Sequence, residues 1–143
     1  MPGAIVFGGP SGRSALYLRF PAAWRARSPL LKGFIALSPS ASAAIDTQHV
    51  TIEVWRVSSD WQASQLHDWS DKPQLALPYV RAELGAQSQG LRINVTELLR
   101  FAEQHRDRDF GIALVARGGS GHGKSFNTGI AGGTAPRLEI YLR

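Results

Sequence analysis

The chain has 143 residues, no cysteine and a hydrophobic fraction of 43%. This length predicts one domain with one core, and a chain without cysteine can form neither disulfide cross-links nor thiolate metal sites. Sixteen Lys and Arg against eleven Asp and Glu give a net charge of +5, which favours anionic partners such as acidic polysaccharides or acidic protein surfaces. Because no window approaches the roughly 20 apolar residues of a membrane helix, no membrane insertion is expected.

Alternation of apolar and polar residues predicts β-strands along most of the chain. In the segment 15–20, for example, Leu16, Leu18 and Phe20 can face one way while the residues between them face the other. About eight short strands, separated by turn-rich connections, predict an antiparallel β-sandwich or jelly roll that spans residues 1–143 as a single all-β domain. The predicted strands cover residues 4–7, 15–20, 32–38, 50–57, 75–82, 91–95, 111–116 and 138–143.

One helix is predicted near residues 95–105, after the sixth strand. Val95, Leu98 and Leu99 follow helical spacing, and Asn94 is the expected N-cap, with Glu97 three residues later as in a capping box. The polar residues beyond position 102 mark its end. We expect this helix to close one end of the sandwich.

A glycine-rich octapeptide matches the phosphate-binding pattern G-x-x-x-x-G-K-[ST] with Gly118, Gly123, Lys124 and Ser125. A nucleotide site also needs a helix that opens at the loop and presents its backbone amides to the phosphates. The following residues 126–136 are rich in glycine and end in proline, which disfavours a helix. We therefore interpret the octapeptide as a hairpin loop before the last strand, and we predict no nucleotide site.

No catalytic residue, cofactor or metal site is predicted, and we expect a protein that is not an enzyme. The four histidines lack the spacing of a zinc site, and no G-x-S-x-G nucleophile motif occurs. Asp60, Asp68 and Asp71 could form an oxygen-rich calcium site, but aspartates in such segments more often form turns. Without a recognition motif, the positive charge does not predict nucleic-acid binding.

Tryptophan in a β-sandwich either fills the core or offers a flat platform on which a sugar ring stacks. We expect Trp61 and Trp69, each beside an aspartate in a turn-rich stretch, to pack against the core. Trp55, on a strand, and Trp24, in a loop, are the predicted platforms. The candidate ligand-binding residues are therefore Trp55 and Trp24, with positive charge supplied by Arg19, Arg92, Arg137 and Arg143.

Several segments in a fixed order resemble a known family. They are 16-LYLRF-20, 54-VWRVSSDWQAS-64, 69-WSDKP-73, 94-NVTELLRFA-102, 110-FGIAL-114 and 136-PRLEIYL-142. Together they resemble DNRLRE-type β-sandwich domains, modules of bacterial and phage surface proteins that include carbohydrate-binding members acting on acidic polysaccharides such as alginate. Members usually begin with a further strand before the one matched by residues 4–7, so the resemblance implies a sheet edge that a neighbour covers. The matching segments are scaffold and identify no sugar-contacting residue.

Two functions follow as expectations. The first is a structural or adhesion subunit that docks on a larger surface assembly, such as a phage virion decoration or tail protein, with protein partners and a homo-oligomeric state. The alternative is a stand-alone carbohydrate-binding module for an acidic polysaccharide. The apolar run at residues 4–7 is shorter than the roughly 7–15 residues of a signal peptide, so a virion or extracellular surface would be reached without a classical signal peptide.

Overall fold

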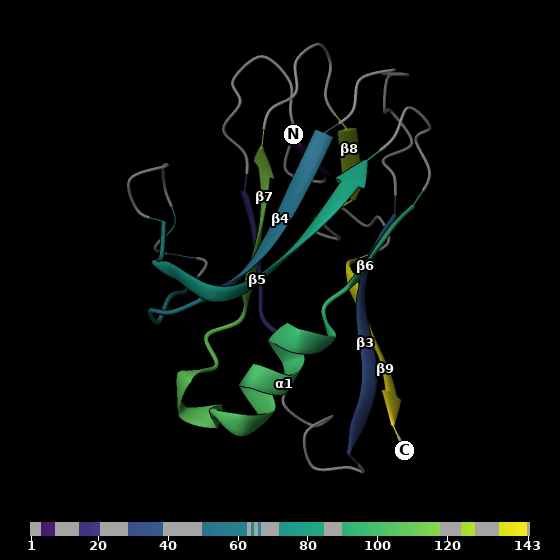
Figure 1. Ribbon diagram of the computed structural model, residues 1–143. Coiled ribbons are helices and arrows are strands. Elements are labelled where there is room, and N and C mark those ends of the chain that lie inside the picture. The colour runs from purple at the N-terminus through teal and green to yellow at the C-terminus, as the bar shows by residue number, and fades with distance from the viewer. Residues whose placement is uncertain are drawn as a thin grey trace.

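The computed structural model describes residues 4–7, 15–20, 29–38, 50–62, 64, 66, 72–84, 90–117, 124–127 and 135–142. Over these residues the fold consists mostly of antiparallel strands with one α-helix (Figure 1). The strands are β1 (Ala4–Phe7), β2 (Ala15–Leu18), β3 (Leu30–Leu37), β4 (Val50–Val57), β5 (Leu75–Leu84), β6 (Leu91–Asn94), β7 (Ile112–Arg117), β8 (Lys124–Asn127) and β9 (Arg137–Leu142). The helix α1 (Thr96–Gln104) is followed by a 3-10 turn at Arg106–Arg108.

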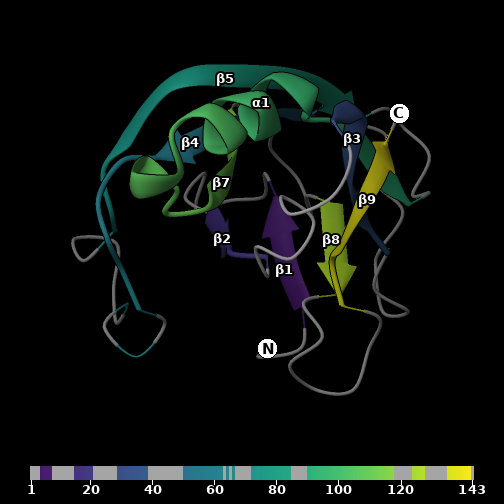
Figure 2. The same ribbon diagram turned by 90° about the horizontal axis from the view of Figure 1, so that it is seen from below.

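The strands form two main sheets and a small third one. The larger sheet has the order β2-β7-β4-β5, and the sheet opposite it has the order β6-β3-β9. Strands β1 and β8 pair with each other, and in Figure 2 they lie between β2 and β9. This arrangement confirms the predicted all-β sandwich, although the sheets do not close into a barrel.

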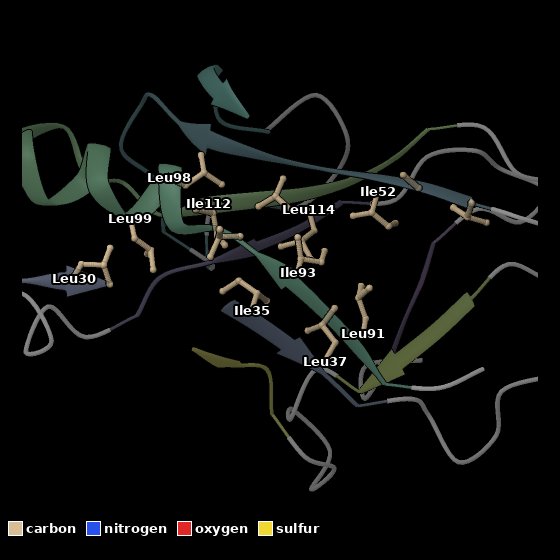
Figure 3. Packing of buried hydrophobic residues seen from close by; sticks show 14 residues of the cluster. Leu30, Ile35, Leu37, Ile52, Leu91, Ile93, Leu98, Leu99, Ile112 and Leu114 are labelled. Carbon is tan, nitrogen blue, oxygen red and sulfur yellow. The ribbon is translucent and has the colours of Figure 1, made fainter. Parts of the chain in front are cut away.

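The core lies between the four-stranded and three-stranded sheets (Figure 3). Alternation on each strand sends every second side chain into this space, so Ile35 of β3, Ile52 of β4 and Leu114 of β7 are fully buried. The side chains of Leu98 and Leu99 extend the same cluster from α1. Burial of these aliphatic groups is the main force that holds the two sheets together.

A second apolar cluster covers part of the outer face of the four-stranded sheet. It explains why β7 is buried on both faces, with Ala113 and Val115 on the outer side and Ile112, Leu114 and Ala116 on the inner side. The outer face of this sheet is therefore not a simple solvent-facing surface. We call this group the outer cluster, and it contains Val57, Ala113 and Val115 with Ala15, Tyr17, Trp55, Trp61, Leu75 and Phe110 packed against them.

Helix α1 occurs where it was predicted, but its N-cap lies one residue later. Val95 occupies the N-cap position, because strand β6 continues through Asn94. Asn94 still stabilises the first turn, since its Oδ1 accepts hydrogen bonds from the backbone N–H of Thr96 at 3.0 Å and from the Thr96 hydroxyl at 2.6 Å. Glu97 pairs with Arg100 instead of forming the predicted capping box.

The helix is attached to the three-stranded sheet at Gly33 of β3. The backbone N–H of Val95 donates to the Gly33 carbonyl at 2.9 Å, and the Gly33 N–H donates to Thr96 Oγ1 at 3.1 Å. From this attachment α1 packs against both β3 and β5, so it lies across one end of the space between the sheets (Figure 1). Its predicted position at the end of the sandwich is confirmed.

The prediction of a hairpin loop at the glycine-rich octapeptide is wrong for two of its residues. Lys124 and Ser125 begin strand β8 and pair with Phe7 and Val6 of β1. The sequence does not predict this strand, because β-structure depends on pairing with a neighbouring strand more than on local propensity. A phosphate-binding loop would run into a helix at this point, and here the chain runs into a strand. Gly118 and Gly123 lie outside the described residues.

Candidate functional site

The predicted ligand-binding residues lie on two faces of the sandwich. Trp55 points from the outer face of the four-stranded sheet, and Arg19 follows β2 at the edge of the same sheet. Arg92 of β6 and Arg137 of β9 lie on the three-stranded sheet. The four residues therefore do not form one site. Trp24 and Arg143 lie outside the described residues.

Trp55 is stacked on Tyr79 of the neighbouring strand β5. The two residues are register partners, and their rings lie 4.3 Å apart at an angle of 11°. Trp55 is half-buried, whereas Tyr79 is 40% exposed. One ring face of Trp55 is thus occupied within the protein, and the more accessible aromatic surface of the pair belongs to Tyr79.

A buried carboxylate holds the Trp55 ring in place. Glu53 points to the same face of β4 and is only 7% exposed. Its Oε1 accepts a hydrogen bond from the Trp55 indole N–H at 3.0 Å, and its Oε2 lies 3.6 Å from a guanidinium nitrogen of Arg81. A buried carboxylate is tolerated only when such partners offset its desolvation. Glu53 therefore fixes the aromatic pair.

Strand β5 carries two large exposed hydrophobic side chains, Leu77 and Tyr79. Leu77 is 66% exposed and precedes Tyr79 by two residues. Arg81, two residues after Tyr79, is also exposed. Among the described strands β5 pairs only with β4, so its other edge faces away from the sheet. The ladder is irregular here, because Trp55 pairs with Tyr79 but Arg56 pairs with Ala76. Leu77 and Pro78 thus form a bulge on the edge.

Arg19 has a structural role in this fold. Its guanidinium pairs with Asp60, donates from Nε to the Phe110 carbonyl at 3.2 Å, and lies 5.1 Å from the centre of the Trp61 ring. The hydrogen bond from Arg19 lowers the pKa of the Asp60 carboxyl. Trp61 itself packs on the outer cluster and donates its indole N–H to the Phe110 carbonyl at 2.6 Å. The predicted packing role of Trp61 is confirmed, whereas Trp69 lies outside the described residues.

Arg92 is the centre of a polar and aromatic group on the outer face of the three-stranded sheet. Its guanidinium carbon lies 3.7 Å from the centre of the Phe34 ring. One nitrogen donates to the Tyr141 hydroxyl at 3.3 Å, and another lies 3.5 Å from Glu139. Tyr141 is 46% exposed and meets Phe34 edge to face at 6.0 Å. We call Arg92, Phe34, Glu139 and Tyr141 the Arg92 cluster.

Arg137 stands beside the Arg92 cluster. It precedes Glu139 and Tyr141 at alternate positions of β9, so the three side chains point to the same face. Lys32 is exposed opposite Tyr141 on β3. Two of the predicted arginines, Arg92 and Arg137, are therefore brought together, with Lys32 as a third cation nearby.

Tyr79, Tyr141, Phe34 and Glu53 were missed as site residues by the sequence reasoning. Each lies at an alternate position of a predicted strand, so the alternation could have placed each on a face. It could not show which cross-strand neighbour each would meet.

The structure gives no sign of the calcium alternative in the region that it describes. Across residues 4–142, with the gaps noted above, no group of three His, Asp or Glu side chains is placed where it could hold a metal ion. Asp60 pairs with Arg19, and Asp68 and Asp71 lie outside the described residues. No helix in the described part of the chain is long and apolar enough to span a membrane.

Comparisons of the chain with models of protein families, with curated proteins and with solved structures found no match. The resemblance to DNRLRE-type domains therefore stays a prediction. The two outer faces, with the chemistry of their exposed side chains, are the features that bear on function.

Proposed function

We propose that this domain is a non-enzymatic structural or adhesion subunit that docks on a larger surface assembly through the outward side of β5. The supporting observation is that Leu77 and Tyr79, two residues apart on an edge strand, are both exposed. Large apolar side chains grouped at an edge are a liability for an isolated protein, and they commonly mark a surface that a partner covers.

The aromatic pair suits a docking role because it is already rigid. Tyr79 is stacked on Trp55, and Trp55 is tied to Glu53 by its indole N–H. A partner that covers Tyr79 would therefore lose little side-chain entropy, and such preorganised aromatic anchors often dominate the binding energy of interfaces. Arg81 supplies a charged group at the rim of the apolar surface.

The form of β5 favours docking through side chains over the addition of a strand. Pro78 has no backbone N–H, and the bulge at Leu77 and Pro78 interrupts the regular ladder. Both features make it harder for another strand to pair with this edge of the sheet. The exposed side chains of Leu77 and Tyr79 remain as the contact surface, and a second copy of this chain is the partner we propose to test.

Sedimentation velocity of the full chain over a range of concentrations tests the proposal. We expect reversible self-association that Leu77→Ser and Tyr79→Ser each weaken at least about tenfold, because each removes apolar contact area. Leu31→Ser is the matched control, since Leu31 is an exposed leucine of the other sheet. A chain that stays monomeric at every concentration, or that associates equally well in all variants, would contradict docking of a second copy through β5.

The Arg92 cluster favours a second candidate, a carbohydrate-binding module for an acidic polysaccharide. The exposed ring of Tyr141 offers a stacking surface, and Arg92, Arg137 and Lys32 surround it with positive charge. Sugar rings stack on such aromatic faces, and guanidinium groups bind carboxylates. Glu139 neutralises part of this charge. Among the residues that the structure describes, no carboxylate pairs with Arg137 or Lys32, so these two are the cations that remain for an anionic ligand.

Electrophoresis in gels that contain alginate separates the two candidates. A monomer that alginate retards, but that a neutral polysaccharide does not, supports the glycan module. Tyr141→Ala should abolish retardation if the Arg92 cluster binds, whereas Trp55→Ala should abolish it, without unfolding the domain, if Trp55 is the platform. No retardation by alginate would exclude both sites for this polymer.

A further inference from the structure

A cavity lies at the end of the sandwich, between α1 and the ends of strands β2, β4 and β7. Its volume is about 200 Å³. Most of its wall is apolar and comes from both sheets and the helix, and its lining includes Leu18, Phe20, Leu98, Phe101, Ala102 and Leu138. It is separate from both outer faces described above, because it opens at one end of the core.

Arg56 is the unusual residue of this cavity. The preceding inward positions of β4 are Val50, Ile52 and Val54, and all three are completely buried. Arg56 continues this inward series and lines the cavity. Arg56 is half-buried there, and a charged side chain is unexpected at a position that continues a series of buried aliphatic residues.

The contacts of Arg56 leave its terminal nitrogens available. Its Nε donates to the Leu77 carbonyl at 2.8 Å, and its guanidinium carbon lies 4.3 Å from the centre of the Phe101 ring. Within the part of the chain that the structure describes, no carboxylate pairs with Arg56. The stem and Nε are thus fixed, while the two terminal nitrogens can serve as a preoriented donor pair.

The other charged groups of the cavity leave Arg56 as its main anion-binding group. Arg19 contributes its stem to the lining, since its guanidinium is held by Asp60 and the Phe110 carbonyl. Arg108 is exposed and adds positive charge to the lining. Asp109 adds a negative charge to the lining, and its Oδ1 accepts a hydrogen bond from the Gly111 N–H at 3.2 Å.

From these observations we propose that the cavity binds a small amphipathic monocarboxylate. The carboxylate would accept hydrogen bonds from the terminal nitrogens of Arg56, whose planar group suits a carboxylate. The apolar part would fill the space beside Phe101 and Leu98. The cavity is larger than the roughly 150 Å³ cavity that is known to accept benzene, so a ligand of the size of benzoate fits. This site is distinct from the docking surface on β5, although the two are linked by the hydrogen bond from Arg56 to the Leu77 carbonyl.

Titration with benzoate, followed by heteronuclear NMR of the full chain, tests the proposal. We expect saturable shifts at millimolar benzoate for the amides of α1 and of the end of β4. Benzyl alcohol has a similar size but no charge, and we expect it to bind at least about tenfold more weakly, since hydrogen bonds to charged groups are the stronger ones.

Two variants and one control examine the two halves of the site. Arg56→Met keeps a long stem against Phe101 but removes the donors, so it should weaken benzoate binding at least about tenfold. Ala102→Leu fills the cavity from the helix and should abolish binding of benzoate and of benzyl alcohol. Arg100→Met removes an arginine of α1 that does not line the cavity and should leave both affinities unchanged.

The proposal is overturned if benzoate causes no saturable shifts, or if benzoate and benzyl alcohol bind equally well. It is also overturned if Ala102→Leu, while still folded, binds benzoate as the parent chain does. Should Arg56→Met fail to fold, the comparison of the two ligands and the Ala102→Leu variant still decide the question. The sedimentation experiment on Leu77 and Tyr79 has an independent outcome, so failure of one proposal leaves the other standing.

Discussion

Gly33 of β3 and Leu99 of α1 approach each other so closely that a side chain at Gly33 has no room. A Cβ atom added to Gly33 would lie 2.1 Å from Leu99 Cδ1 and 3.5 Å from Ile140 Cδ1. The same glycine exchanges hydrogen bonds with the start of α1 through its N–H and its carbonyl. The position of the helix at the end of the core therefore depends on a residue without a side chain.

Gly33→Ala should lower the free energy of unfolding by about 1–3 kcal/mol, as overpacking of a filled core usually does. Leu99→Ala alone should cost about 2–5 kcal/mol through the cavity that it creates. The double variant should be less destabilised than the sum of the two, because the shorter side chain at 99 makes space for the new methyl group. Urea unfolding of the four proteins measures this, and strict additivity would show that Leu99 is not the obstacle.

Glu53 should be important for stability through the hydrogen bond that it accepts. Glu53→Ala leaves the Trp55 indole N–H without its acceptor, which should cost about 1–3 kcal/mol. Glu53→Gln retains a carbonyl oxygen in the same place, so its loss should be clearly smaller. Arg81→Ala should cost less than about 1 kcal/mol, because this arginine is mostly exposed. Equal losses for the alanine and glutamine variants, measured by urea unfolding, would contradict this account.

The sequence alone could locate strands that carry a run or an alternation of apolar residues. Strands at residues 4–7 and 50–57 were predicted with the bounds that the structure shows. The segment Lys124–Asn127 has only one large apolar residue, Phe126, so nothing local indicates a strand. Its strand character comes from pairing with β1, which lies more than one hundred residues earlier. Prediction failed where structure depends on a distant partner.

The candidate sites were less predictable than the fold for the same reason. Trp55 was singled out by its residue type, but its contact with Tyr79 depends on the register of β4 and β5. The bulge at Leu77 and Pro78 interrupts the pairing of the two strands. Pro78 indicates an edge or a bulge, but the sequence does not show how many residues the bulge contains. Likewise, alternation places Arg56 on the inner face of β4, yet only the packing of α1 shows that it lines a cavity.

Arg19 should stabilise the fold through packing more than through its ion pair. Arg19→Ala removes the contact with the Trp61 ring and the hydrogen bond to the Phe110 carbonyl, and should cost about 1–2 kcal/mol. Asp60→Asn should be nearly neutral at pH 7, because that carboxyl is exposed to solvent, where ion pairs contribute little. Thermal unfolding at low and high salt measures the contribution of the ion pair. A large loss of stability in Asp60→Asn that high salt suppresses would show that the ion pair, and not packing, is the main contribution of Arg19.

Tyr17 should make the protein less stable in alkali. Burial raises the pKa of the Tyr17 phenol above its ordinary value of 10.0, because the phenolate would lose hydration beside Trp61 and the outer cluster. The unfolded chain then loses this proton at a lower pH than the folded chain does. The stabilising contribution is complete below the unfolded pKa and declines as the pH rises through the folded pKa.

Tyr17→Phe removes this titration and retains the ring. In urea unfolding between about pH 8 and 11, the parent chain should lose stability relative to Tyr17→Phe as the pH rises past the ordinary tyrosine pKa of about 10. Every other side chain is common to both proteins, so the difference between the two isolates Tyr17. A difference in stability that stays constant across this range would show that the Tyr17 phenol titrates as it does in the unfolded chain, and that the outer cluster does not exclude water from it.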